Sequence, residues 1–186
     1  CFMTEWCIKK YHPEKIIVSC DASLCKLMNA AGYYAKGKFF QHVIEPYRYI
    51  LDDHVFDEEG YIIDQGSMQS IPFGWFDTQR KGCGWIAAYN LLKANRKYTP
   101  MCEVIHDLEK HNLLGKVSGQ EMLWLIVYLR QKGLDIFVSL PGFSAAMHAF
   151  QSCSSGILAY SHARGAHYAM FEKINDTDAH FYNAVY

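Results

Sequence analysis

The stretch of residues 79–92 constrains this chain more than any other. It begins polar, reaches Cys83 between two glycines, and continues as an apolar run typical of a buried helix. A thiol at this position lies at the N-terminal end of the helix, where backbone N–H groups and the helix dipole favour negative charge. We expect this position to lower the thiol pKa and to raise the fraction of thiolate, the form that attacks. The alternative is a buried, inert cysteine, because unpaired cysteine is among the most buried residue types.

Length and composition limit what the chain can be. Its 186 residues suffice for one domain with a small extension, and 51% hydrophobic residues indicate a globular protein. The net charge of −1 argues against a nucleic-acid partner, which usually requires a basic surface. No apolar run approaches the roughly 18 residues that a membrane span requires, so we predict no span in this chain.

The seven cysteines do not suggest a disulfide framework. Their number is odd and their spacing irregular, which favours a reducing compartment and predicts a cytoplasmic protein. Four of them gather near the N-terminus without forming a Cys-x-x-Cys motif, so we predict no zinc site and no other cofactor. These four are Cys1, Cys7, Cys20 and Cys25.

Residues 71–186 read as helices followed by strands. Helices are predicted at 84–94, after Thr99-Pro100, at 122–131 behind a capping box at 118–121, and at 143–152. A β-rich run covers 134–140. Three further strands, 156–161, 166–174 and 180–186, have short connections, with a turn at 175–178. They predict an antiparallel meander, and the class is α+β.

The first 70 residues carry no recognisable catalytic motif. Strands are predicted at 15–19, 39–51 and 61–63, a helix at 21–34, and a loop at 66–80. We therefore predict two parts: residues 1–70 as an N-terminal extension packed on the core, and residues 71–186 as the catalytic domain. The extension as a wall of the substrate cleft, or as a pro-segment, is the alternative.

A cysteine nucleophile needs a base, and the base needs an orienting partner. Three histidines precede or lie on the predicted meander: His148, His162 and His167. His167 is the best placed, because it begins a strand and follows two small residues, Gly165-Ala166, that leave room beside it.

The orienting partner should lie on the next strand. Asn183 lies there, sixteen residues after His167 and across the predicted hairpin. Asn183 is expected to accept a hydrogen bond from the imidazole and to fix its tautomer. Asp176 and Asp178 are charged alternatives, but they occupy the tip of the turn, far from His167.

The order Gln79, Cys83, His167, Asn183 resembles that of the papain-like cysteine peptidase superfamily. The 84 residues from Cys83 to His167 look more like the compact bacterial branch that includes peptidases trimming double-glycine leaders. In that branch a Cys-Gly pair opens the helix, as Cys83-Gly84 does here, and the run Gly-Ala-His167-Tyr-Ala-Met-Phe resembles its histidine strand. The resemblance covers roughly residues 76–186.

The resemblance implies a papain-like fold, with the nucleophile helix packed on an antiparallel sheet. It also implies a peptidase or amidase in which Cys83 attacks the carbonyl of a peptide or small acyl substrate and His167 is the base. The Cys83 backbone N–H and the Gln79 side chain would hold the oxyanion. An acyltransferase on the same fold, with an amine as the second acceptor, is one alternative, and a non-catalytic binding module is the other.

Overall fold

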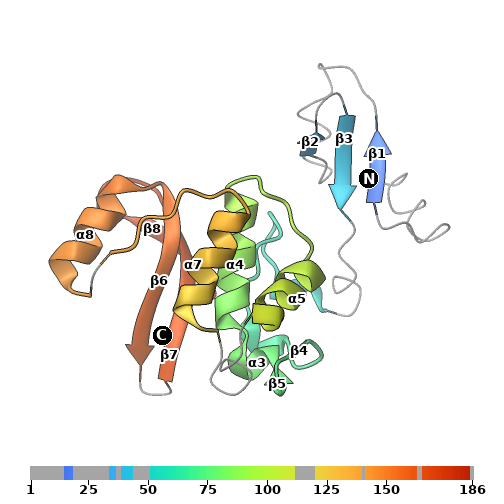
Figure 1. The fold of residues 1–186 in the computed structure, drawn as a ribbon, viewed down its shortest axis with the longest axis horizontal. Coiled ribbons are helices and arrows are strands. Elements are labelled where there is room, and N and C mark those ends of the chain that lie inside the picture. The colour runs from blue at the N-terminus through green and yellow to red at the C-terminus, as the bar shows by residue number, and fades with distance from the viewer. Residues whose placement is uncertain are drawn as a thin grey trace. The chain divides into compact units, whose positions relative to one another are not determined.

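The computed structural model describes the backbone of residues 15–18, 34–36 and 39–43, and residues 51–111, 120–139, 141–162 and 165–184. The chain divides into two compact units, Cys1–Pro46 and Tyr47–Tyr186. The first contains a three-stranded antiparallel sheet in the order β1-β3-β2 (Figure 1). Its strands are β1 (Lys15–Val18), β2 (Tyr34–Lys36) and β3 (Phe39–Val43). Strands are thus confirmed within 15–19 and 39–51, whereas residues 21–33 of the predicted helix and the four N-terminal cysteines lie outside the described residues.

The second unit begins with short elements and then forms longer helices. The short elements are η3 (Asp53–Val55), η4 (Gln65–Ser67), β4 (Pro72–Phe73), β5 (Phe76–Asp77) and α3 (Thr78–Lys81). The helices that follow are α4 (Cys83–Ala94), α5 (Met101–His111), α7 (Met122–Gln131) and α8 (Phe143–Ser152). The helices predicted at 84–94, 122–131 and 143–152 and after Thr99-Pro100 are confirmed.

The C-terminal strands form the predicted meander. They are β6 (Ser155–His162), β7 (Gly165–Lys173) and β8 (Ala179–Tyr182), all antiparallel, in the order β6-β7-β8. The Asn175 Oδ1 closes the predicted turn by accepting from the backbone N–H groups of Thr177 and Asp178. The α+β class is confirmed.

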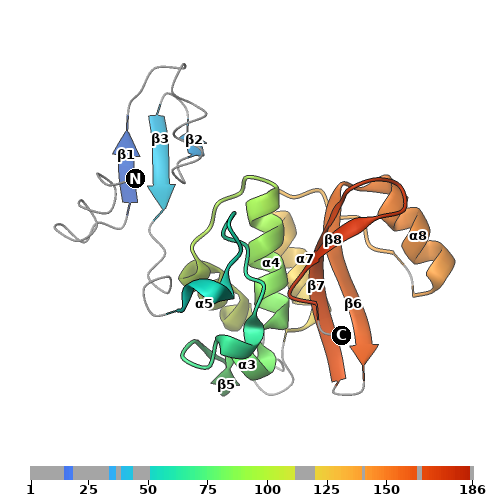
Figure 2. The same cartoon turned by 180° about the vertical axis from the view of Figure 1, so that it is seen from behind.

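Helix α4 lies at the centre of the second unit. It packs against β7 and β6 on one side and against α5 and α7 on the other (Figures 1 and 2). Its residues from Gly84 to Leu92 are buried, which explains why the sequence of this helix has so little polar surface. Figures 1 and 2 show that α3, which leads into α4, lies at the same end of the unit as the start of β7.

The segment 51–70 belongs to the same core. Val55, Ile62 and Met68 are fully buried in it. The side-chain amide of Asn90, on α4, accepts from the Ile62 N–H and donates to the Ile62 oxygen, at 2.9 Å in both directions. The predicted division between residues 70 and 71 therefore separates segments that pack together, and the division between the two compact units falls after Pro46.

The loop predicted at 66–80 is wrong in part. Gly74, at φ 63°, connects β4 to β5 in a tight hairpin. The Asp77 carboxylate then accepts from the backbone N–H of Arg80 and caps α3. These polar and glycine residues, read as loop signals, instead form the elements that deliver the chain to Cys83.

Two other predictions need correction. The run predicted as a strand at 134–140 forms none over residues 134–139, although its alternate residues Leu134 and Ile136 pack on the core. Its side chains alternate between the core and the surface as in a β-strand, but the run pairs with none of the described strands. Helix α7 has Glu121 as its N-cap with no side-chain cap bond, so the predicted capping box does not form there; Ser118 lies outside the described residues.

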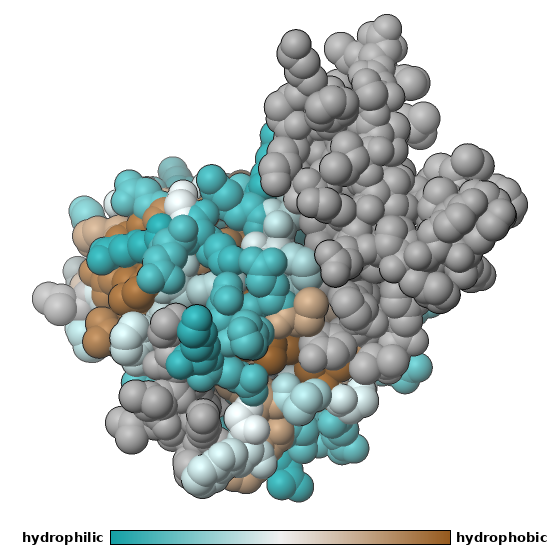
Figure 3. Space-filling view, turned by 45° about the vertical axis from the view of Figure 1, so that its right-hand side comes forward, coloured by the Kyte–Doolittle hydropathy of each residue, from teal (hydrophilic) through white to brown (hydrophobic). Residues whose placement is uncertain are grey.

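The described surface is mostly polar on the face drawn in Figure 3, with hydrophobic side chains in separate patches. Large exposed apolar side chains include Trp75, Leu123, Phe137 and Phe143. None of the described helices has both the length and the apolar character that crossing a membrane requires.

Candidate functional site

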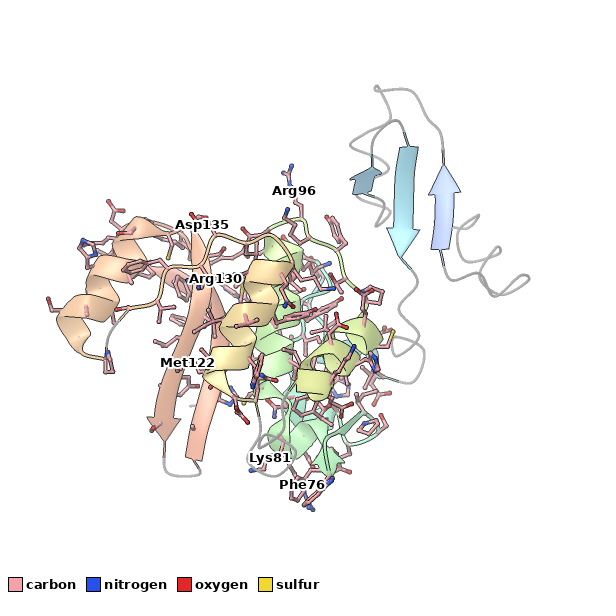
Figure 4. All side chains as sticks on the ribbon, viewed as in Figure 1. Phe76, Lys81, Arg96, Met122, Arg130 and Asp135 are labelled. Atoms are coloured by element: carbon pink, nitrogen blue, oxygen red, sulfur yellow. The ribbon has the colours of Figure 1, made fainter. Side chains whose placement is uncertain are left out.

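Cys83 is the first residue of α4. The short helix α3 meets the longer helix α4 here, because Gly82 is both the C-cap of α3 and the N-cap of α4. Figure 4 shows Lys81, the last residue of α3, at the end of the unit that also carries Phe76, and the Lys81 Nζ lies 5.8 Å from the centre of the Phe76 ring. Cys83 as a residue is partly buried.

Backbone groups surround the sulfur of Cys83. Backbone groups of Tyr168, Gly84 and Cys83 itself act to lower the pKa of the thiol, and so does the positive charge of Lys81. Each of these favours the thiolate. Burial nevertheless raises the pKa of the Cys83 thiol and outweighs them, so the expected lowering of the pKa is wrong for this resting state. At neutral pH the thiol keeps its proton, and it needs a base.

Gly84 allows the close contact that holds this end of α4. A Cβ at this position would lie 2.2 Å from the Gln120 Cβ and 3.6 Å from the Tyr168 Cδ2. Any side chain at position 84 would therefore collide with Gln120, near the backbone, where a shift is costly. The Cys-Gly pair is thus a packing requirement of the site, and Gln120, read from the sequence as part of a cap, is the residue that imposes it.

His167 lies on β7 directly before Tyr168, whose backbone acts to lower the pKa of the Cys83 thiol. The start of α4 thus lies beside the stretch of β7 that carries His167. His167 is only 6% exposed, and its ring packs edge-on against the Tyr160 ring, with the centroids 5.5 Å apart. Its position is fixed by the sheet, because Tyr160 is its paired residue on β6.

Asn183 contacts His167, but through its main chain. The His167 Nε2 lies 2.6 Å from the main-chain oxygen of Asn183. Because a carbonyl oxygen can only accept, we assign the proton to Nε2, and the neutral ring then has Nδ1 as its basic nitrogen. The contact thus uses the main-chain oxygen of Asn183 and not the side chain that the sequence suggested.

The side chain of Asn183 is turned toward Gln65. Its Oδ1 accepts from the Gln65 N–H at 3.1 Å, and its Nδ2 donates to the Gln65 Oε1 at 3.0 Å. Asn183 has φ 56°, in the left-handed region where Asn is one of the favoured non-glycine residues. Gln65 was missed from the sequence, because it lies in a segment without a motif, 118 residues away.

Gln79 does not serve the site in the predicted way. Its Nε2 donates to the Gly66 oxygen at 2.6 Å, and its Oε1 accepts from the Gln69 Nε2 at 2.7 Å. Both ends of the amide are thus engaged by the loop around η4.

The remaining candidates lie elsewhere or form no cluster. Asp176 pairs with Lys173 at the turn, as expected of a residue far from His167. His148 lies on α8, and the side chain of His162 is outside the described residues. Within the described ranges, no three His, Cys, Asp or Glu side chains are grouped so that they could hold a metal ion. Trp85 is fully buried, as predicted for a core residue.

Comparison with known proteins adds no relative. The chain matches no family model, no curated protein and no solved structure.

Proposed function

We propose that this protein is a cysteine-dependent acyl-transfer enzyme, a peptidase or amidase of papain-like architecture, with Cys83 as nucleophile and His167 as base. One observation carries the proposal. The Cys83 thiol, at the first residue of α4, lies close enough to the backbone of Tyr168, the residue after His167, for that backbone to act on its pKa, while the main-chain oxygen of Asn183 holds His167. Covalent catalysis at a carbonyl needs a nucleophile, a base beside it and a group that orients the base.

The mechanism follows from the protonation states. The Cys83 thiol gives its proton to the His167 Nδ1 as the sulfur attacks the carbonyl carbon of an amide. The C–N bond then breaks, the amine leaves with the proton from the imidazolium, and an acyl-enzyme thioester remains. Water, deprotonated by His167, attacks the thioester and releases the acid. The third group is a main-chain carbonyl, which stabilises the imidazolium by accepting from Nε2–H.

Backbone N–H groups are the proposed oxyanion donors. The N–H groups of Cys83 and Gly84 belong to the first turn of α4, which has no intrahelical acceptors for them. Both backbones act on the thiol pKa and so lie close to the sulfur, and the oxyanion is the oxygen of the carbonyl carbon that the sulfur attacks. One such donor is typically worth about 3–4 kcal/mol of transition-state stabilisation. This arrangement explains how the site dispenses with the Gln79 side chain.

The direct test uses p-nitrophenyl acetate, a general acyl donor, with mass-spectrometric mapping of the acetyl group. We expect acetylation of Cys83, release of nitrophenolate and turnover. Cys83→Ala abolishes both, and His167→Ala slows them by about 10²- to 10⁴-fold, the usual contribution of a general base. Cys153→Ala is the matched control, because it removes another half-buried thiol and leaves turnover unchanged. Wild-type turnover in Cys83→Ala would overturn the proposal.

The second acceptor is decided by the same experiment. With glycinamide present, a peptidase or amidase still releases mainly acetate, because water enters the site. Formation of N-acetylglycinamide in place of acetate would change the assignment from hydrolase to acyltransferase. No acetylation of Cys83 under any condition would favour a non-catalytic binding module.

A further inference from the structure

A single side-chain amide, that of Gln65, touches both halves of the proposed site. Its Oε1 accepts from the Asn183 Nδ2 at 3.0 Å, on the histidine side. Its Nε2 donates to the main-chain oxygens of Thr78 and Gln79, at 2.9 Å and 3.0 Å, on the side of the helix that leads to Cys83. The backbone N–H of Gln65 adds a fourth hydrogen bond, to the Asn183 Oδ1.

The histidine side depends on an unusual backbone conformation. Asn183 is one of two non-glycine residues with positive φ among the described residues. In that conformation its main-chain oxygen reaches the His167 Nε2 at 2.6 Å. The side chain of Asn183 is bound at both its oxygen and its nitrogen by Gln65, and the residue is only 7% exposed. Gln65 therefore holds Asn183 in the conformation that fixes the tautomer of His167.

The cysteine side depends on α3. The Gln65 Nε2 donates hydrogen bonds to the main-chain oxygens of Thr78 and Gln79, the first two residues of that helix. Thr78 is itself buried and accepts from the Trp85 Nε1 through its hydroxyl oxygen at 3.2 Å, which ties α3 to α4. The loop around η4 is thereby fixed to the turn that sets the start of α4 and the position of Cys83.

We infer that Gln65 is a positioning residue that couples the two halves of the site, holding the carbonyl of Asn183 on His167 and the α3 turn behind Cys83. This inference rests on the proposed function for its catalytic consequence. Its structural content, the tautomer of His167, is independent of that function. Gln65 acts through other residues and is not placed at the reacting atoms.

The principal test is ¹⁵N NMR of histidine-labelled protein, with the His167 signals assigned by their loss in His167→Gln. We expect the Nε2–H tautomer in the wild type and a mixture of tautomers in Gln65→Ala. Turnover of p-nitrophenyl acetate by Gln65→Ala should fall about 10- to 100-fold in kcat with KM unchanged, because a misplacement of about 1 Å costs up to 10²-fold.

Gln69→Ala is the matched control. Gln69 is a glutamine of the same loop, and its described hydrogen bond goes to the Gln79 side chain, away from His167 and Cys83. This variant should keep both the tautomer and the rate. If Gln65→Ala does not fold, Gln65→Glu keeps the acceptor for the Asn183 Nδ2 and loses the donor to the two carbonyls. It should keep the tautomer and still lose rate.

The outcomes separate this inference from the proposed function. A wild-type tautomer and rate in Gln65→Ala, or in both Gln65 variants, overturns the inference. A mixed tautomer in Gln65→Ala together with no acetylation of wild-type Cys83 overturns the proposed function and leaves the positioning of His167 by Gln65 supported. A mixed tautomer with a reduced kcat supports both.

Discussion

Two half-buried thiols lie at opposite ends of helices in this molecule. Cys83 is the first residue of α4, whereas Cys153 follows the last residue of α8 and is its C-cap. Burial raises the pKa of both thiols. Around Cys83 three backbone groups oppose that rise, but the Cys153 sulfur faces the Phe150 oxygen at 3.9 Å, at the end of a helix where carbonyls gather.

The two helices also differ in how they are held. All residues of α4 from Gly84 to Leu92 are buried, and none of α8 is. A thiol on α4 is thus fixed by a core, and a thiol beside α8 is fixed mainly by local contacts. The comparison teaches that partial burial alone does not make a reactive thiol; the polarity of the helix end and the rigidity behind it distinguish Cys83.

The largest expected difference concerns stability. Trp85→Ala removes a fully buried indole and its hydrogen bond to Thr78, and should lower the free energy of unfolding by about 3–5 kcal/mol. Phe150→Ala, on α8, loses a half-buried ring that contacts Phe171 with centroids 5.5 Å apart, and should cost about 1 kcal/mol. Urea denaturation with unchanged m-values measures both. Equal losses would show that α8 is as firmly held as α4.

A smaller difference is expected at the glycines beside the two thiols. Gly84→Ala should cost about 1–3 kcal/mol, because the new Cβ meets the Gln120 Cβ at 2.2 Å. Gly156→Ala meets the rim of the Phe171 ring at 2.9 Å and should cost less, because the far end of a side chain can move. Thermal melting ranks the two variants.

Restoration by a second substitution sharpens this test. Gln120→Gly removes the atoms that the new Cβ of Gly84→Ala would meet, so the double variant should regain melting temperature and acetylation of Cys83. If Gln120→Gly adds its own loss to that of Gly84→Ala without any coupling, the contact at Gly84 is not what limits this position.

The pH dependence of alkylation comes next. Because burial raises the pKa of both thiols, each stays protonated at neutral pH, and its thiolate forms only above the ordinary value of about 8.5. The rates of labelling by iodoacetamide, followed for each cysteine by mass spectrometry, should therefore rise on the alkaline side for both. If the alkylation rate of Cys83 has its pH midpoint well below about 8.5, the thiol forms an ion pair with His167 before substrate binds. Cys83 and Cys153 would then differ in protonation state at neutral pH.

The parts of the structure that could be predicted are those with local signals. Helix α4 and the β6–β8 meander follow from periodicity and turn residues, and these place Cys83 and His167 on the right elements. The run 134–140 shows the limit of periodicity, because alternation indicates which side chains face the core but not whether a partner strand is present.

The contacts within the candidate site could not be predicted from the sequence. The pairing of Asn183 with Gln65 joins residues 118 positions apart, and no local pattern announces it. That the main-chain oxygen of Asn183 contacts His167 follows from a positive φ, which the residue type permits but does not require. The direction of the Cys83 pKa likewise depends on burial by distant segments, which overrides the local effect of the helix end.

The smallest expected effect comes from the lysine near each thiol. Lys81 acts to lower the pKa of Cys83, and Lys173 acts to lower that of Cys153. Replacing either with Ala should raise the corresponding thiol pKa further and slow alkylation at pH 8 by about two- to threefold, the size of an exposed charge interaction. The slowing should shrink as salt is added, because the interaction is screened.

The two lysines should not be equivalent, however. The Lys173 Nζ lies 3.0 Å from the Asp176 Oδ1, so that the carboxylate cancels part of its field at Cys153. Lys81→Ala is therefore expected to have the larger effect, and Asp176→Asn should lower the pKa of Cys153 by strengthening the field of Lys173. If Lys173→Ala has the larger effect at low salt, distance rather than the neighbouring carboxylate determines how strongly each lysine acts on its thiol.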